Sequence, residues 1–135
     1  MSLVLIRRSF EKKLALLTPA LATAYENAAF TPVNGTPYQR VHLIPSTPDN
    51  STMGSSLYFE RGIFQVTLCY SCGIGPLSIE TQAQLLRTHF KRGTSLVEEG
   101  VTVTVTDTPR VAPGFPDGDR YTIPISVPWQ AQIST

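Results

Sequence analysis

Residues 58–70 read Tyr-Phe-Glu-Arg-Gly-Ile-Phe-Gln-Val-Thr-Leu-Cys-Tyr, and this stretch predicts one long strand around which the fold is organised. Side chains alternate between the two faces of a strand, so one face of this stretch is apolar and the other is mixed. The apolar face carries Phe64, Val66, Leu68 and Tyr70. An extended segment of this length spans roughly 40 Å, about twice a typical strand. We therefore expect a strand that holds a small sheet together and also projects beyond it.

The pair Arg61-Gly62 divides this strand into two parts. The inner part, 63–70, carries the apolar alternation, and the outer part, 58–61, continues from the preceding loop. Glycine inside a strand often marks a bulge or a bend. We therefore predict a bulge or bend at Gly62, with the outer part sensitive to assembly and the inner part insensitive to it.

The composition favours a single folded domain over residues 1–135. The chain is 41% hydrophobic and only 16% charged, against about 25% charged in an average domain. Neutral surface of this kind is suited to association between proteins. The net charge is +1 and the Lys and Arg residues are scattered, so no basic stripe indicates nucleic-acid binding.

The chain gives no sign of export or membrane insertion. No window approaches the roughly 18 apolar residues of a membrane helix, and the apolar run Leu3–Ile6 is too short for a signal peptide. The two cysteines imply no disulfide framework. The expectation is a soluble, intracellular protein without membrane contact.

Two segments have the three- and four-residue apolar spacing of amphipathic helices. The first covers about 2–17, with Ser2 as its N-cap, and the second covers about 77–91, with Ser78 as its N-cap. Strands are predicted at 23–27, 38–44, 95–97 and 101–106, besides the long strand at 58–70. In the 101–106 strand the valines should face a helix, and the threonines should face solvent or a neighbouring subunit.

A last strand begins at Tyr121, with Ile123, Ile125 and Val127 also facing inward. Pro124 and Pro128 fall on its other face and cannot donate to a ladder, so the pattern favours an edge or interrupted strand. Segments 45–56 and 108–119 are predicted to be long loops, the first a protruding hairpin. The fold class is therefore α+β, with two helices on one face of a mostly antiparallel sheet of about five or six strands.

Several residue patterns could carry chemistry, and each is incomplete. Cys69-Tyr70-Ser71-Cys72 is a Cys-x-x-Cys pair, but it lies before the helix start that would lower a thiol pKa. Zinc would need two more ligands, and His42 and His89 do not have finger-like spacing. Gly73-x-Gly75 lacks the Gly-Lys-Ser/Thr ending of a phosphate loop.

The acidic residues also lack a catalytic or calcium-binding arrangement. Glu98-Glu99 is interpreted as a solvated turn, and Asp117-Gly118-Asp119 lacks the further oxygen ligands of a calcium loop. No nucleophile elbow accompanies the serines. We therefore predict no enzyme, no catalytic residue, no cofactor and no metal, and a structural, assembly-type protein instead.

Short pieces in the same order along nearly the whole chain resemble the phage and prophage tail terminator, or tail completion, proteins. These pieces are 17–27 (Leu-Thr-Pro-Ala-Leu-Ala-Thr-Ala-Tyr-Glu-Asn), 30–32 (Phe-Thr-Pro), 35–41 (Gly-Thr-Pro-Tyr-Gln-Arg-Val), 48–50 (Pro-Asp-Asn), 61–66 (Arg-Gly-Ile-Phe-Gln-Val), 92–93 (Arg-Gly) and 117–119 (Asp-Gly-Asp). One departure is Tyr25, where tryptophan is more usual.

The resemblance implies an α+β subunit that forms a ring, expected to be a hexamer, on the end of the tail tube. Such a ring stops tail polymerisation and offers a surface to the head–tail connector, so the implied partners are further copies, the tail tube protein and the connector protein. The implied location is the host cytoplasm during assembly and then the virion tail. The alternatives are a neck or head-closure protein and, in a different class, a small-ligand or thiol-redox module.

Loop length and strand position, rather than the resemblance, suggest interface residues. The candidates are Asp49, Asn50, Met53, Arg61 and Arg110. We expect Arg61→Glu and Met53→Asp to weaken the ring while the monomer stays folded.

Overall fold

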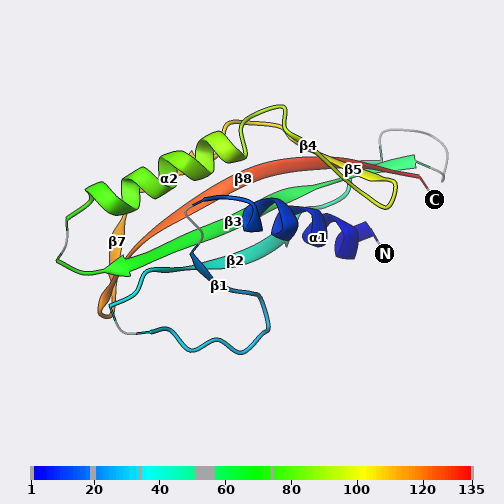
Figure 1. Ribbon diagram of the computed structural model, residues 1–135. Coiled ribbons are helices and arrows are strands. Elements are labelled where there is room, and N and C mark those ends of the chain that lie inside the picture. The colour runs from blue at the N-terminus through cyan, green and yellow to red at the C-terminus, as the bar shows by residue number, and fades with distance from the viewer. Residues whose placement is uncertain (1, 19–20, 34, 51–56, 74, 135) are drawn as a thin grey trace.

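The computed structural model describes residues 2–18, 21–33, 35–50, 57–73 and 75–134 of the chain. It contains two helices and eight strands (Figure 1). The helices are α1 (Ser2–Ala15) and α2 (Leu77–His89). The strands are β1 (Ala22–Ala24), β2 (Tyr38–Pro45), β3 (Leu57–Ser71), β4 (Ser95–Glu98), β5 (Val101–Val105), β6 (Arg110–Val111), β7 (Phe115–Asp117) and β8 (Arg120–Ser134).

All the strands belong to one sheet with the order β1-β2-β3-β8-β5-β4. The short strands β6 and β7 pair with β8 beyond the end of β5. Only β1 and β2 run parallel, and every other pair is antiparallel. The predicted α+β class is confirmed, and the two additional short strands lie within the predicted loop 108–119.

Both helices cover the same face of the sheet and close one core (Figure 1). Aromatic rings join the layers at its centre. Phe10 of α1 stacks on Phe64 of β3 at 4.8 Å between centroids, and Phe90 after α2 lies 6.0 Å from both rings. Trp129 of β8 lies 6.2 Å from Phe10. Burying such rings removes a large apolar area from water, and their offset and tilted arrangements are the favourable ones.

Strand β3 is the long strand that the sequence predicts. It pairs with β8 over its whole length, from Leu57 opposite Ser134 to Ser71 opposite Arg120, and with β2 over eight residues. Neither register slips, so the predicted bulge at Gly62 is wrong. A Cβ atom at Gly62 would collide with the Ile44 carbonyl oxygen and lie 3.0 Å from the Trp129 ring. Glycine is therefore required because two neighbouring strands crowd this position.

Strand β8 is continuous and lies inside the sheet, so the prediction of an edge or interrupted strand is wrong. Its odd-numbered residues face the core as predicted from Ile123 to Val127, and the same facing continues beyond the prediction to Ile133. The backbone groups of Pro124 and Pro128 point away from β3: Ala112 N–H donates to the Pro124 carbonyl and Thr106 N–H to that of Pro128. Ala112 follows the last residue of β6, and Thr106 follows the last residue of β5. The missing N–H of each proline therefore falls where the neighbouring strand has already ended, so no ladder hydrogen bond is lost.

The helix caps differ from the prediction. Pro76, not Ser78, occupies the N-cap position of α2, without a side-chain hydrogen bond. Proline suits the start of a helix because its missing N–H has no intrahelical role there. Ser2 is already helical in α1. Helix α1 ends two residues earlier than predicted, and a turn follows in which Leu17 N–H bonds the Leu14 carbonyl.

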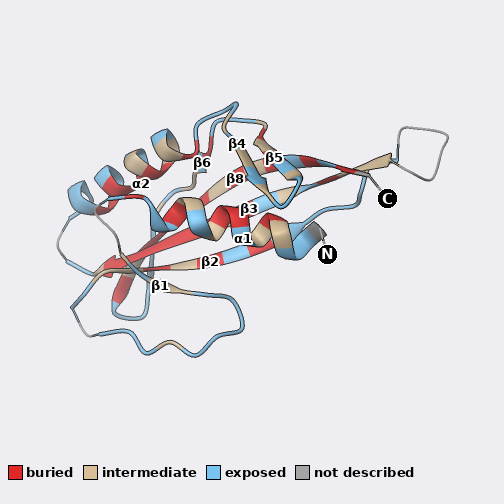
Figure 2. Ribbon diagram, turned by 45° about the vertical axis from the view of Figure 1, so that its right-hand side comes forward, coloured by how far each residue is buried: buried red, intermediate tan, exposed pale blue. Residues whose placement is uncertain are grey.

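The ends of β3 and β8 extend past the start of α1 and form an arm (Figure 2). The chain after β2 continues along it: Ser46 N–H donates to the Arg61 carbonyl, and Asp49 and Phe59 exchange two backbone hydrogen bonds. The predicted hairpin 45–56 is thus present as far as residue 50. Its tip, 51–56, lies outside the described residues.

Glu26 joins three elements in one charged contact. Its Oε1 accepts hydrogen bonds from Arg7 of α1 at 2.7 Å and from the Leu43 N–H of β2 at 3.0 Å. These bonds, the Arg7 bond first, lower the pKa of Glu26 below its ordinary value of 4.5. The carboxylate therefore ties α1 to the connection after β1 and to β2.

We expect Glu26→Gln to reduce the acid sensitivity of folding. A lowered native pKa gives stability that is complete above about pH 4.5 and is lost as the pH falls through the native pKa. The stability lost should be at most about 1 kcal/mol, because the pair is partly exposed. Urea unfolding at pH 7 and pH 3 would measure it, with Glu80→Gln on α2 as the control. Equal acid sensitivity in wild type and Glu26→Gln would contradict this role.

We also expect Gly62→Ala to destabilise the fold by about 1–3 kcal/mol, because the added methyl overpacks a rigid site against the β2 backbone. Urea unfolding would report the change. Gln130→Ala, an exposed position on the neighbouring strand, should change stability by less than about 0.5 kcal/mol. A Gly62→Ala protein as stable as the wild type would refute the close-packing account.

Candidate assembly surfaces

The sheet face opposite the helices divides into a covered half and a bare half. The covered half lies beside Val33 and Thr36 of the loop before β2. Thr122 there is fully buried and donates to the Phe115 carbonyl at 3.2 Å. Arg120, 7% exposed, donates to the carbonyls of Thr36 at 2.6 Å and Val33 at 2.8 Å. A buried guanidinium thus fastens a long exposed loop to the sheet.

The bare half, which we call the outer sheet face, is formed by the strand side chains that point away from the helices and the core. Register places its residues side by side on β2, β3, β8, β5 and β4. It comprises Ile44, Phe59, Arg61, Ile63, Val97, Thr102, Thr104, Thr106, Gln130 and Gln132. Arg61 is the single charged side chain in this set, so association here would require little desolvation of charge.

A shallow groove of about 390 Å³ crosses the outer sheet face. It is lined by Phe59, Thr102, Thr104, Thr106, Gln130 and Gln132. On the opposite side of β5, Val103 and Val105 are buried against the core. The predicted separation of valines and threonines is confirmed, and the threonine face is the part available to a partner.

Sequence reasoning missed the apolar part of this surface. Ile44 and Ile63 are direct cross-strand partners and are 46% and 36% exposed. Val97, opposite Thr102, is 68% exposed. Both isoleucines occupy strand positions whose side chains point away from the core, where polar residues are expected. An apolar residue at such a position was the sequence feature that could have indicated this surface.

The structure places most of the predicted interface residues on this side of the molecule. Arg61 and Arg110 are exposed, and their cross-strand partners on β8 are Gln130 and Ser126. These two partners are four residues apart, roughly 13 Å along the strand. Asp49 pairs with Phe59 on the arm, and Asn50 beside it is exposed. Met53 lies outside the described residues, so the structure does not place it.

The predicted acidic turn does more than contact solvent. Glu98 forms an ion pair with Lys12 at 2.8 Å, and Glu99 forms one with Arg8 at 3.5 Å. These contacts attach the β4–β5 hairpin to α1. Glu99 and Gly100 have positive φ, as a tight hairpin requires. The glutamates therefore act between elements and are not paired for acid–base chemistry.

The cysteine and glycine motifs lie at the end of β3 and in the connection from β3 to α2. Cys69 is buried and Cys72 is exposed, and both are free thiols. Among the residues that the structure describes, no group of three or more metal-ligating side chains occurs. His89 uses Nε2 to bond the Lys13 carbonyl at the end of α1. Gly73 and Gly75 have positive φ and form the strand-to-helix connection.

Tyrosines near the thiols have perturbed titration. The pKa of Tyr38 is raised, chiefly by burial and then by its hydrogen bond with Cys69, and burial alone raises that of Tyr70. Both phenols are therefore neutral at physiological pH.

Within the described part of the chain, no helix is long and apolar enough to cross a membrane.

Comparison with known proteins identifies the family of this chain. The family model described as phage tail terminator protein matches residues 5–129. The chain belongs to this family. The resemblance seen in the sequence is confirmed, and the protein is a structural component of the phage tail type.

A solved structure is also similar over the full length of this chain. The two chains are 29% identical, all of this chain aligns with 99% of the other, and the TM-score is 0.79. That protein carries no functional description, so the likeness supports the fold and not a role. A search of curated proteins finds no match.

Proposed function

We propose that the chain caps the tail tube as a ring, expected to be a hexamer, which ends tail polymerisation and presents the surface for head joining. Membership of the tail terminator family is the observation that carries this proposal. The proposed partners are further copies of the chain, the tail tube protein and the head–tail connector protein. Assembly would take place in the host cytoplasm, and the final location is the virion tail.

The outer sheet face supports the proposal as one side of the subunit contact. A ring of identical subunits needs a heterologous interface, in which one patch binds a different patch on the next copy. The outer sheet face combines a neutral groove with exposed Ile44, Ile63 and Val97. Neutral polar and apolar groups with few charges are the usual composition of an interface. The arm places Asp49 and Arg61 at the margin of this surface.

We expect Thr104→Lys to weaken self-association at least about tenfold, because an unpaired charge would be buried in the groove. Analytical ultracentrifugation over a range of protein concentrations would measure the effect, since a ring can dissociate on dilution. Thr88→Lys, on the exposed side of α2, is the matched control. If both variants associate as the wild type does, the groove is not a subunit contact.

Arg61→Glu and Met53→Asp test the arm in the same assay. We expect both to weaken the ring, while circular dichroism shows a folded monomer. Arg61 is exposed and has no core contact to lose, so a folding defect is not expected. Normal rings and normal tail termination in these variants would remove both residues from the proposed interface.

Deletion of the gene in its phage or prophage tests the function itself. Abnormally long tails in electron micrographs are the expected result, because nothing would then stop the tube polymerising. Complementation with the wild-type gene should restore uniform length. Tails of normal length beside unjoined heads would instead indicate a neck or head-closure protein and overturn the terminator role.

A further inference from the structure

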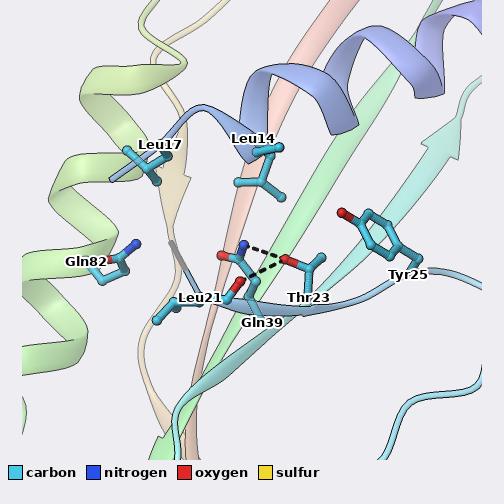
Figure 3. Close-up of a pocket in the computed structure, with 8 residues that line it drawn as sticks. Leu14, Leu17, Leu21, Thr23, Tyr25, Gln39 and Gln82 are labelled. Carbon is cyan, nitrogen blue, oxygen red and sulfur yellow. Dashed lines mark hydrogen bonds between the residues drawn. The ribbon is translucent and has the colours of Figure 1, made fainter. Parts of the chain in front are cut away.

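A pocket of about 240 Å³ lies between the end of α1, the β1 segment and α2 (Figure 3). Its walls include Leu14, Ala15, Leu17 and Leu21, and its polar groups come from Thr23, Tyr25, Gln39 and Gln82. It lies on the helix-covered side of the sheet, away from the outer sheet face. Among the described residues, no carboxylate or basic side chain lines it. The pocket thus combines apolar walls with neutral polar groups, and both kinds of group line ligand sites.

One polar atom at this pocket lacks a partner. Gln39 is only 4% exposed, and its Oε1 is buried without a hydrogen bond among the described residues. An unpaired buried acceptor costs about 1–3 kcal/mol. A group that donates a hydrogen bond to Gln39 Oε1 would recover this cost.

The orientation of the Gln39 amide is set by its neighbours. The Thr23 hydroxyl donates to the Leu21 carbonyl at 3.2 Å, so its oxygen is left as an acceptor. Gln39 Nε2 donates to that oxygen at 3.0 Å. The amide nitrogen is therefore directed at Thr23, and Oε1 points away from Thr23, toward the side bounded by Leu17 and Gln82 (Figure 3).

We propose that this pocket binds a neutral aromatic group that carries one O–H or N–H donor, such as a phenol or an indole. The apolar walls would hold the ring, and the donor would bond Gln39 Oε1. A cavity of about 150 Å³ accommodates benzene, so the space of about 240 Å³ is sufficient. A charged ligand is disfavoured because the lining offers no opposite charge.

Phenol and toluene, which differ by a hydroxyl and a methyl, test the site on the isolated chain. We expect phenol to bind about tenfold more tightly, as one recovered hydrogen bond implies. Nuclear magnetic resonance would follow the Gln39 side-chain amide and the Leu14, Leu17 and Leu21 methyls. Equal affinities, or no shift of these signals by phenol, would overturn the proposal. A crystal structure with an ordered water on Oε1 that phenol does not displace would also overturn it.

The variant Gln39→Leu tests the proposed acceptor. Phenol should lose its tenfold preference, while toluene should bind at least as well as to the wild type. If this variant does not fold, Gln39→Glu keeps an acceptor of similar size, and phenol should retain its preference. An unchanged preference in folded Gln39→Leu, or a lost one in Gln39→Glu, would exclude Gln39 Oε1 as the acceptor.

The aromatic group could come from a free small molecule or from a tyrosine or tryptophan of another tail protein. Ala15→Trp should fill the pocket from its exposed rim, and Leu16→Trp is the matched control because Leu16 is exposed and does not line it. Loss of tail assembly in Ala15→Trp alone would identify the protein source. A bound mass in native mass spectra of wild type and Leu16→Trp, absent from Ala15→Trp, would identify the small molecule. If neither is seen, the pocket has no such ligand in the cell.

The phenol binding test is separate from the terminator role. The phenol preference is measured on the isolated chain, so it stands or fails whatever the tail length in a deletion mutant.

Discussion

The unbroken ladder between β3 and β8 is the constraint on which the rest of the molecule depends. Because the two strands stay in register over their full length, every core-facing side chain of one lies opposite a core-facing side chain of the other. A slip of one residue between them would turn the apolar row of one strand away from the core. The two helices can close a core around Phe64 and Trp129 only because this register holds, and the arm exists only because the ladder continues past α1.

The features that follow from alternation could be predicted from sequence, and those that depend on neighbours could not. The faces of β3, β5 and β8 are readable because period-two patterns are local. The role of Gly62 is not, since it reflects the approach of the β2 backbone and the Trp129 ring from distant parts of the chain. The interior position of β8 was hidden for a similar reason: whether Pro124 lacks a bond depends on where β6 ends.

The candidate surfaces show the same division. The threonine face of β5 was predicted correctly, but the Ile44–Ile63 pair emerges only from the register of β2 on β3. Gln39 gave no signal in the sequence, where it belongs to an ordinary alternating strand. Its importance comes from Thr23, which is brought beside it by the parallel pairing of β1 with β2. Chemistry that depends on tertiary neighbours becomes visible only with coordinates.

The two prolines of β8 also limit how the sheet can grow. Where β5 has ended and β6 has not begun, Pro128 of β8 has no N–H to donate and its carbonyl already accepts from Thr106; the same holds for Pro124, whose carbonyl accepts from Ala112 beyond β6. An open sheet margin with its full set of donors is a template for strand addition by another chain. A protein that is proposed to stop polymerisation of the tail tube must not itself polymerise by strand addition. These prolines make uncontrolled edge-to-edge growth less favourable and leave the faces of the sheet for ordered contacts.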